Sequence, residues 1–402
     1  MTSMTKHTLI DCFTLRARIG WQGLRSDEFK TEGAYLVTGT DFHNGRVDWD
    51  DCYHVTEERY KQDKGIQLHE HDLLITKDGT IGKTAVVIDC PEKATLNSGV
   101  FVVRTINNEV VPEFLHYILH SRWFDLFVRN VLTGSTIKHL NQEKFYKFEF
   151  EAPDVPTQKK IVSVLESIDD VIDKIRDLIE KYTSLMKGVV QDILTDDIND
   201  ENTVKIGSFA DALGGKRIPK GSELTIAKTA HPYIRVRDMT KPKVIELTDD
   251  YMYVEESDFH KISRYIVNAG DLIISIVGTV GAVALVGETL DKANLTENCS
   301  KIVNIKGYSP EFLYYFLKSE YGQKEIAGGT VGEVQAKLPL KNILEINVPI
   351  LSMPDQEAIV EKLRILDEKI DKEVQYYSKM ESIKAGLMHD LLSGSIDATM
   401  IE

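Results

Sequence analysis

The stretch DLLITKDGTIGKTAVV, residues 72–87, recurs with changes as DLIISIVGTVGAVALV at residues 271–286. Both copies keep an aspartate, an apolar run and a Gly-Thr-x-Gly segment, which are the features of a strand followed by a tight turn. A second pair of blocks lies at nearly the same offset, because PEFLHYIL at residues 112–119 answers PEFLYYFL at residues 310–317. An offset of about half the chain indicates one tandem duplication and not a solenoid, whose repeats are about 20 to 50 residues long.

The first copy contains KDGTIGKT, which ends like the phosphate-binding loop of an NTPase. That loop needs a glycine, four further residues and then Gly-Lys-Thr. Lys77 stands where the first glycine should be, and Ala282 and Val283 replace Lys83 and Thr84 in the second copy. The groups that would hold phosphate and magnesium are therefore not repeated, and the spacing argues against an NTPase that uses Lys83.

A third repeated pair begins two long helical patterns. VPTQKKIV at residues 155–162 answers MPDQEAIV at residues 353–360, and an apolar heptad seam follows each block. The predicted seam residues are Ile161, Leu165, Ile168, Ile172, Ile175 and Ile179 in the first helix, and Ile359, Leu363, Leu366, Ile370, Leu387 and Leu391 in the second. Glu373 and Lys384 interrupt the second seam, but Val374 and Ile383 stand beside them. A helix with one apolar stripe must bury that stripe against a partner, and the duplicate helix is the obvious partner.

We therefore predict an α+β protein, in which a mixed α/β domain followed by a long helix is duplicated in tandem. The two helices are expected to pack as an antiparallel coiled coil within the chain, although pairing between two chains stays open. The predicted boundaries are 1–153 and 202–350 for the mixed domains, and 154–201 and 351–402 for the helical segments.

Composition places the 402-residue chain among ordinary soluble proteins, with 42% hydrophobic and 28% charged residues. The sequence has no apolar run of about 18 residues and no secretion signal, so we expect a cytoplasmic location. The four cysteines form no C-x-x-C pair and have no histidine at metal-binding spacing, so we predict free thiols and no metal. Most of the net charge of −15 lies in the helical segments, where 6 and 6 basic side chains stand against 12 and 11 acidic ones. A local DNA-binding face on either mixed domain is therefore compatible with the acidity of the whole chain.

The chain resembles a known family, the specificity (S) subunits of type I restriction–modification enzymes. The resemblance covers the whole chain and rests on the order and duplication of its motifs, since each motif alone is weak. Besides the repeated blocks, it includes RIGWQGL at 18–24, YLVTGTDF at 35–42, GSTIKHL at 134–140, GGKRIPKG at 214–221 and YIRVRDM at 233–239.

The resemblance implies a sequence-specific DNA-binding subunit without catalytic residues of its own. In this family two target-recognition domains each read one half of an asymmetric bipartite site, and the conserved helices act as a spacer that sets the distance between the half-sites. The implied partners are double-stranded DNA, two methyltransferase (modification) subunits and restriction subunits, with one copy of this chain per complex and no membrane. S-adenosylmethionine would belong to the methyltransferase subunits, and ATP with magnesium to the restriction subunits. The alternative function is that of a structural coiled-coil scaffold or dimerisation protein without sequence-specific DNA binding.

Candidate DNA-binding residues are basic or polar side chains in turn-like, glycine-containing stretches, where loop-borne recognition residues are expected. They are Arg16, Arg18, Arg46, Lys77, Lys83, Ser135, Lys138 and His139 in the first domain, and Lys216, Arg217, Lys220, Arg235, Arg237 and Lys337 in the second. We interpret the glycines of the two Gly-Thr-x-Gly segments as turn formers. The GSTIKHL loop corresponds to a longer segment, GTVGEVQAKL at 329–338, so the two domains are expected to read different sequences.

Overall fold

The two copies of the strand–turn–strand segment lie in two separate units of the computed structural model. The structure describes residues 3–19, 23–132, 139–194, 202–240, 242–332 and 335–398. The chain divides into one unit made of Met1–Asp177 with Gln375–Glu402, and a second unit made of Leu178–Val374. Each unit therefore holds one mixed domain together with part of both long helices. We call the mixed parts domain 1 (residues 3–153) and domain 2 (residues 202–350).

The apolar run after Asp72 forms the central strand of domain 1, β7 (Leu73–Thr76), in which all four residues are buried. In the described part of the domain this strand belongs to a six-stranded sheet of order β2-β10-β7-β8-β5-β4. The other strands are β2 (Phe13–Arg16), β10 (Val100–Thr105), β8 (Thr84–Val86), β5 (Arg46–Val47) and β4 (Phe42–His43). Both faces of a strand can be apolar only when both faces of its sheet are covered, which predicts a layer on each side.

Alternating side chains of β7 belong to two different hydrophobic cores. Leu73 and Ile75 pack against α3 (Pro112–Leu119), α4 (Arg122–Leu132) and α5 (Gln142–Phe145) on one face of the sheet. Leu74 packs on the opposite face, toward β3 (Ala34–Val37) and β9 (Ala94–Leu96). Those two strands and β6 (Tyr53–Val55) make a separate three-stranded sheet in the order β6-β3-β9. The period-2 direction of strand side chains thus explains why an unbroken apolar run was needed here.

Domain 2 repeats this arrangement around β17 (Leu272–Ser275), whose four residues are all buried. Its described strands form a five-stranded sheet of order β13-β20-β17-β18-β15 and a three-stranded sheet of order β16-β14-β19. The bounds are β13 (Asp211–Gly214), β20 (Cys299–Val303), β18 (Val283–Val286), β15 (Val244–Ile245), β16 (Met252–Tyr253), β14 (Pro232–Ile234) and β19 (Asn294–Leu295). The helices on its first face are α8 (Pro310–Lys318), α9 (Glu320–Gly329) and α10 (Leu340–Ile343). The repeated blocks PEFLHYIL and PEFLYYFL thus form equivalent helices, which begin at Pro112 and Pro310.

Short elements complete the described chain. A strand pair closes each domain at its N-terminal end, β1 (Thr5–Thr8) with β11 (Glu149–Ala152) and β12 (Thr203–Lys205) with β21 (Asn347–Pro349). The remaining helices are α1 (Leu9–Cys12), α2 (Glu57–Lys61) and α7 (Glu256–Ile262), with 3-10 turns η2 (Ser26–Glu28), η3 (Lys64–Ile66), η4 (Ile206–Ser208), η5 (Val236–Met239) and η6 (Glu288–Leu290).

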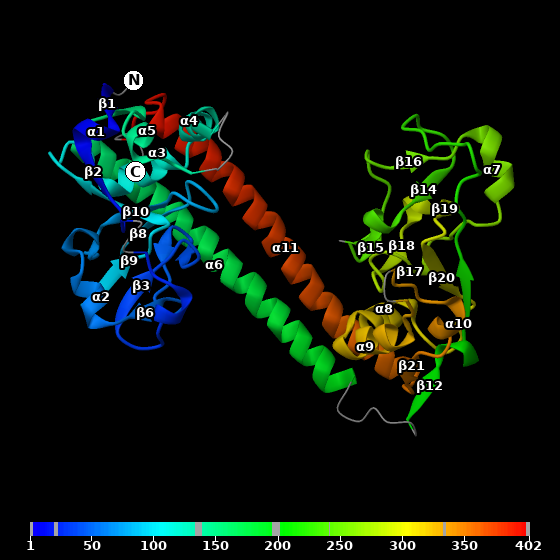
Figure 1. Cartoon of the computed structure of the whole chain (residues 1–402). Helices are drawn as coiled ribbons and strands as arrows, with labels where there is room; N and C mark the ends of the chain where they lie inside the picture. The colour runs from blue at the N-terminus through cyan, green and yellow to red at the C-terminus, as the bar shows by residue number, and fades with distance from the viewer. Residues whose placement is uncertain are drawn as a thin grey trace. The chain divides into compact units, whose positions relative to one another are not determined.

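Each domain is followed by one helix of 40 residues, α6 (Val155–Leu194) and α11 (Met353–Leu392) (Figure 1). Both helices begin at the residue before the proline of the repeated Pro-x-Gln block. Proline is tolerated there because the first-turn N–H groups have no partner inside the helix. The side chain of Asp154 accepts a hydrogen bond from the N–H of Thr157 (2.9 Å), and Ser352 caps α11 in the same way through Asp355 (3.3 Å).

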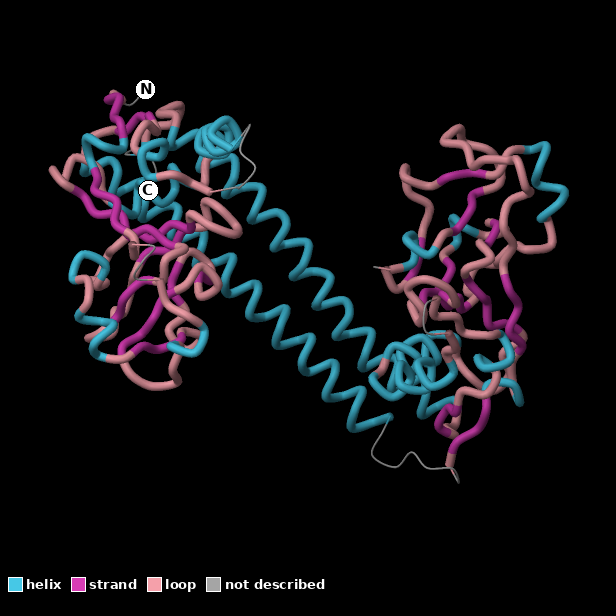
Figure 2. The backbone as a smooth tube through the Cα atoms, in the orientation of Figure 1, coloured by secondary structure: helices cyan, strands magenta, loops and turns pink. Residues whose placement is uncertain are grey.

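Inside each unit the two helices lie side by side (Figure 2), and they run in opposite directions, as the colour gradient in Figure 1 shows. In the first unit Lys384 of α11 forms an ion pair with Asp169 of α6. Seven residues later on α6, Arg176 contacts the hydroxyl of Tyr377, which lies seven residues earlier on α11 than Lys384. In the second unit the ammonium of Lys369 lies 5.4 Å from the ring centre of Tyr182. Since one residue number rises as the other falls, the predicted antiparallel coiled coil within the chain is confirmed.

The predicted seam residues lie in this interface. Of the twelve, eight are buried and Ile168, Ile179, Ile370 and Leu387 are partly buried. The expectation that Val374 and Ile383 compensate for the two interruptions is wrong, because both are 44% exposed. Glu373 and Lys384 keep the seam positions themselves, and Lys384 does so by pairing with the carboxylate of Asp169 across the helices. Among the described residues, no helix is apolar over a length that could cross a membrane.

The glutamine of each Pro-x-Gln block joins its long helix to the rest of its domain. Gln158 is fully buried and accepts a hydrogen bond from the N–H of Val111 (2.9 Å), while its amide nitrogen donates to the carbonyls of Glu109 and Pro153 (2.8 Å each). Gln356 makes the equivalent three bonds, to the N–H of Ser309 and the carbonyls of Gly307 and Leu351. The glutamine is thus fully satisfied in both copies, which explains why the Pro-Glu-Phe-Leu and Pro-x-Gln blocks recur together.

Candidate nucleic-acid interface

The Gly-Thr-x-Gly turns have the same backbone structure in both domains. In domain 1 the Thr76 hydroxyl donates to the carbonyl of Thr80 (2.5 Å) and accepts from the N–H of Lys83 (3.0 Å). In domain 2 Ser275 makes the matching bonds to Thr279 and Ala282. All four glycines have positive φ, between 66° and 89°, which only glycine adopts without strain. The interpretation of these glycines as turn formers is confirmed.

In domain 1 this turn adjoins three other turns at one end of the six-stranded sheet. The N–H of Lys77 donates to Gly99 O, and the N–H of Leu140 donates to Lys77 O (2.9 Å each). The Lys83 ammonium reaches Gly39 O (3.4 Å), and a side chain on Gly39 would strike Thr76. We call this group turn cluster 1 (residues 38–41, 77–83, 97–99 and 139–140).

Turn cluster 1 brings together three of the predicted DNA-binding residues, Lys77, Lys83 and His139. Lys77 and Lys83 are half-buried, and the Lys77 ammonium lies 5.2 Å from the ring centre of Phe101. His139 contacts the carboxylate of Asp78, an acidic neighbour that the sequence reasoning missed. Arg16, exposed at the end of β2, lies at the same end of the sheet because it pairs with Val102 of β10.

Domain 2 has a comparable group of turns, which we call turn cluster 2 (residues 215–217, 276–282, 296–298 and 335–338). Three of its four segments are equivalent to segments of turn cluster 1, and residues 215–217 are not. The N–H of Ile276 donates to Asn298 O (2.7 Å), and the N–H of Leu338 donates to Ile276 O (2.9 Å), as in domain 1. The exposed Lys337 forms a bridge with Val277, and the N–H of Lys216 donates to Leu295 O (2.8 Å). The structure therefore brings Lys216, Arg217 and Lys337 to neighbouring turns.

Arg217 is held by an acidic residue that the sequence reasoning also missed. Its Nε donates to Glu297 Oε1 (2.5 Å), although the arginine side chain is 76% exposed. Burial opposes the ionisation of Glu297, but hydrogen bonds from Arg217 and Thr296 outweigh it and lower the pKa of this carboxyl. Glu297 is therefore charged at neutral pH and fixes the direction in which the guanidinium points.

Several predicted contact residues lie elsewhere. The prediction for Arg18 is wrong in this structure, because the side chain is only 1% exposed and donates to Leu96 O (2.9 Å) and to the hydroxyl of Thr95 (3.3 Å) inside domain 1. Arg235 also binds within its own domain, because its guanidinium donates two hydrogen bonds to the carboxylate of Asp238 (2.8 and 2.9 Å). Arg237 and Lys220 are exposed outside turn cluster 2, and Ser135 and Lys138 fall outside the described residues.

Arg46 faces α6 rather than a turn cluster. Its guanidinium lies 3.9 Å from Asp170, beside a cavity of about 110 Å³ that Glu113, Glu166 and Asp169 also line. Burial and the like charge of Glu113 raise the pKa of Glu166. DNA phosphates would be repelled here, so the prediction that Arg46 binds DNA is not supported by its surroundings.

In domain 2 the equivalent contact between the domain and its long helix has two basic side chains, Lys243 and Arg364, beside its carboxylates. Lys243 contacts Glu311 (2.5 Å) and the hydroxyl of Tyr315 (2.6 Å), and Arg364 of α11 pairs with the same glutamate (2.7 Å). Lys243 is equivalent to Gly45, because their carbonyls accept from the N–H of Leu285 and Val86 in the matching strands. In domain 2, Lys243 and Arg364 therefore balance Glu311 and Asp367, whereas carboxylates outnumber Arg46 at the equivalent place in domain 1.

We expect Lys243→Met to lower the free energy of unfolding of domain 2 by about 3 kcal/mol, because it leaves the half-buried Glu311 with one partner fewer. Urea denaturation measures the effect. Lys228→Met is the matched control, since the Lys228–Asp249 pair is exposed and worth about 1 kcal/mol or less. Equal effects of the two substitutions would contradict the view that the ion pair of Lys243 with the half-buried Glu311 stabilises domain 2.

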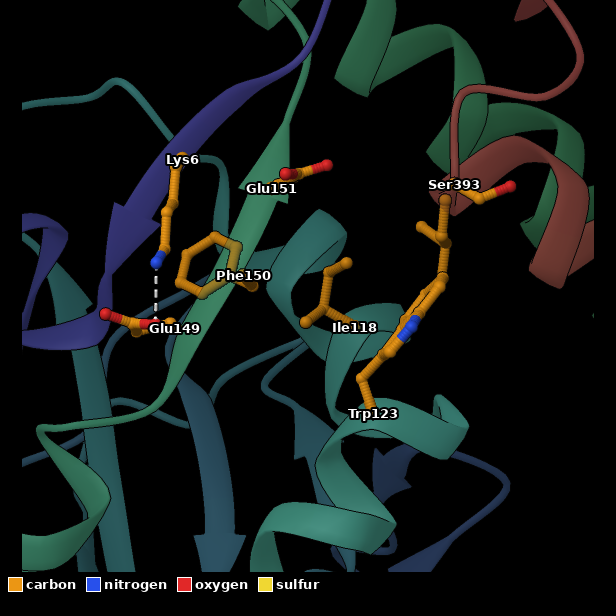
Figure 3. A pocket seen from close by; sticks show the side chains of 8 residues that line it. Lys6, Ile118, Trp123, Glu149, Phe150, Glu151 and Ser393 are labelled. Atoms are coloured by element: carbon orange, nitrogen blue, oxygen red, sulfur yellow. Dashed lines mark ion pairs between the residues drawn. The ribbon is translucent and has the colours of Figure 1, made fainter.

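A cavity of about 370 Å³ in domain 1 lies where the end of α11 packs on α3 and α4 (Figure 3). Ile118, Trp123 and Phe150 line it together with an ion pair between Lys6 and Glu149 (2.7 Å). Trp123 also lies 5.6 Å from the ring of His389 on α11. This cavity lies outside turn cluster 1, and its lining packs the helix against its domain.

Comparison with known proteins agrees with the duplicated architecture. The family described as type I restriction modification DNA specificity domain matches residues 20–181 and 199–381. The chain is 22% identical over 349 residues to the type I restriction enzyme MjaVIII specificity subunit of Methanocaldococcus jannaschii, covering 83% of this chain and 81% of the relative. It is 24% identical over 342 residues to the EcoBI specificity subunit of Escherichia coli, covering 77% and 70%.

Two solved structures share the fold. The crystal structure of a type I restriction–modification S subunit from M. genitalium gives a TM-score of 0.59 at 15% identity, over 97% of this chain and 96% of that one. A chain from a study of complex assembly and conformational transition of the type I system gives 0.55 at 12% identity, over 97% of each chain. The protein is thus a DNA sequence-recognition protein of a restriction–modification system. More narrowly, the chain belongs to the family of type I restriction–modification specificity subunits.

Proposed function

We propose that this chain directs type I methyltransferase and restriction subunits to an asymmetric bipartite DNA site, with each domain reading one half-site. The observation that carries the proposal is the pair of turn clusters, which share a backbone and differ in side chains. Lys77, Asp78 and Lys83 of the first turn are replaced by Ile276, Val277 and Ala282 in the second. One scaffold with two sets of base-reading and phosphate-binding groups is what an asymmetric site requires.

The chain would bind DNA without catalysing a reaction. S-adenosylmethionine would be bound by the methyltransferase subunits, and ATP with magnesium by the restriction subunits, in complexes that act on cytoplasmic DNA. In that arrangement the turn clusters supply phosphate contacts from their lysines and arginines. Base contacts come from the polar side chains that the same turns hold in fixed directions.

The outer surfaces of the long helices are suited to protein partners. Tyr376 and Ile383 of α11 are 47% and 44% exposed, and their spacing of 7 residues places them on one line along the helix. Leu178 and Leu185 lie one heptad apart on α6 and are also exposed. Apolar stripes rimmed by carboxylates favour protein binding over DNA binding. We assign them to two methyltransferase subunits, with one copy of this chain per complex.

Replacing Lys216 and Arg217 by alanine should weaken methylation that depends on the second half-site and should leave complex assembly intact. DNA binding should also depend less on salt. The slope of the logarithm of the binding constant against the logarithm of the salt concentration should decrease by about one unit for each phosphate contact removed. The measurement is fluorescence anisotropy of a labelled duplex at several salt concentrations, with the assembled methyltransferase complex.

Two matched variants sharpen this test. Glu297→Gln removes the negative charge that neutralises Arg217 and should strengthen DNA binding. Lys228→Ala removes an exposed lysine outside turn cluster 2 and should change little. Unchanged affinity and slope in the double variant would remove Lys216 and Arg217 from the interface, and absent DNA binding by the intact complex would favour the scaffold alternative.

A further inference from the structure

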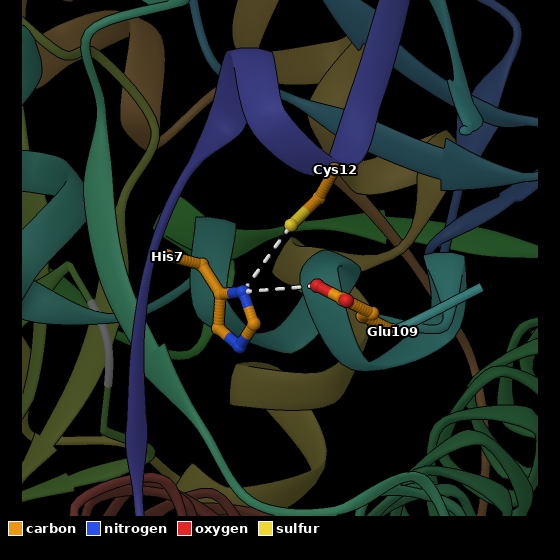
Figure 4. Close-up of side chains that lie close together, drawn as sticks. All are labelled: His7, Cys12 and Glu109. Carbon is orange, nitrogen blue, oxygen red and sulfur yellow. Dashed lines mark hydrogen bonds and ion pairs between the residues drawn. The ribbon is translucent and has the colours of Figure 1, made fainter. Parts of the chain in front are cut away.

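His7, Cys12 and Glu109 come together at the N-terminal end of domain 1 (Figure 4). His7 lies on β1, Cys12 is the last residue of α1, and Glu109 stands in the turn before α3. The His7 Nδ1 atom is 3.4 Å from Cys12 Sγ and 3.9 Å from Glu109 Oε2. The three ligand atoms all lie within 4.8 Å of one another. The sequence offered no metal-binding spacing here, because the glutamate is remote along the chain.

One imidazole nitrogen cannot satisfy both of its neighbours. If Nδ1 carries a proton, it can donate to the sulfur or to the carboxylate, but not well to both. If Nδ1 is unprotonated, it accepts from the thiol and turns its lone pair toward a carboxylate oxygen. A cation among the three atoms would remove the conflict.

The donor set is that of a zinc site. Thiolate sulfur, imidazole nitrogen and carboxylate oxygen are the three ligand types that zinc takes, and three protein ligands leave a fourth position for water. Tetrahedral coordination at normal bond lengths separates ligand atoms by roughly 3.5 Å. The distance from His7 to Cys12 is 3.4 Å, and the exposed Glu109 side chain, at 3.9 Å, would move slightly closer on binding. Cys12 is fully buried whereas the Glu109 side chain is 61% exposed, so the site would open toward solvent on the glutamate side.

Domain 2 has none of these ligands, although its backbone is the same. Strand pairing makes Val204 equivalent to His7, since they stand opposite Val348 and Phe150. Phe209 replaces Cys12, because the carbonyls of Phe209 and Cys12 accept from the N–H groups of Lys306 and Ile106, which follow the equivalent strands β20 and β10. Gly307 replaces Glu109, as shown by the matching bonds from Gln356 and Gln158. The fold therefore forms without the three side chains, and their convergence in domain 1 is an addition to it.

We propose that His7, Cys12 and Glu109 bind a zinc ion that ties the start of the chain to the turn before α3. Binding replaces the S–H bond of Cys12 by an S–Zn bond, and the proton passes to solvent. The carbonyl of Glu109 also accepts from Gln158 at the start of α6. The ion would thus hold β1 next to the junction between domain 1 and its long helix.

The test is a titration of the metal-free full chain with Co²⁺, followed by Zn²⁺ competition against a chromophoric chelator. One equivalent of Co²⁺ should give visible bands of tetrahedral intensity and a thiolate-to-cobalt band in the near ultraviolet. Zn²⁺ should displace it. Cys12→Ser should abolish the thiolate band, and Glu109→Gln should weaken Zn²⁺ binding by about tenfold or more.

Glu109→Gln keeps the test decisive even if Cys12→Ser misfolds, because this side chain is exposed and its backbone makes the structural bonds. Cys90→Ser is the control, since Cys90 lies outside the three-residue group and should leave the spectrum unchanged. A cobalt spectrum without a thiolate band, or a band and affinity that survive both Cys12→Ser and Glu109→Gln, would overturn the proposal.

Discussion

Inserting one heptad into each long helix should lengthen the spacer between the two halves of the methylated DNA site by about three base pairs. Seven residues lengthen a helix by roughly 10 Å, and base pairs are about 3.4 Å apart along DNA. The insertions belong between Asp177 and Leu178 of α6 and between Val374 and Gln375 of α11, where the chain divides into its two units. Long-read methylation sequencing of plasmid DNA would report the motif and its spacer directly.

The insertion must be made in both helices because they are antiparallel. A heptad in α6 alone keeps the face of the seam but shifts one unit's contacts, such as Asp169 with Lys384, relative to those of the other, such as Tyr182 with Lys369. That single insertion is the control and should impair assembly. A double insertion that assembles and methylates with the original spacing would contradict the proposal that the helices set the half-site distance.

Replacing Gln158 by leucine should destabilise the first unit by at least about 3 kcal/mol. Leucine is similar in size but leaves the N–H of Val111 and the carbonyls of Glu109 and Pro153 without their partner. Each buried polar group left unpaired costs about 1 to 3 kcal/mol. Differential scanning calorimetry or urea denaturation measures the loss, and Gln356→Leu should reproduce it in the second unit.

The exposed Gln375 of α11 provides the control for the change from an amide to an apolar side chain. Gln375→Leu should leave stability within about 0.5 kcal/mol of the starting protein. A similar small effect for Gln158→Leu would mean that the buried hydrogen bonds do not hold the long helix to its domain.

Most of the fold was predictable because its signals are periodic or repeated. The heptad seam from Ile161 and the duplicated apolar runs at 72–87 and 271–286 depend on side-chain direction within one element. The Pro-x-Gln blocks were visible as repeats, but their purpose was not. It depends on a hydrogen bond between Gln158 and Val111, which are far apart along the chain. The exposure of Val374 and Ile383 was equally hidden, because Lys384 keeps its seam position through an ion pair with Asp169, which is remote along the chain.

The candidate interface was only partly predictable, because charge in a sequence says nothing about its neighbours in space. Lys216, Arg217 and Lys337 meet through turns that converge after folding. Arg18 carries the same charge and lies in a similar glycine-containing stretch, yet it is buried beneath β9. Acidic partners such as Glu297 gave no signal in the sequence, and they determine which basic groups remain free to meet phosphate.

The most direct test of the targeting function is a methylome comparison of cells that express the cognate methyltransferase with and without this chain. The proposed function predicts that one asymmetric bipartite motif is methylated only when the chain is present. A third culture with Lys216 and Arg217 replaced by alanine should lose discrimination in one half of that motif only. If a stable complex with an active methyltransferase forms and no methylation depends on the chain, the targeting function is contradicted.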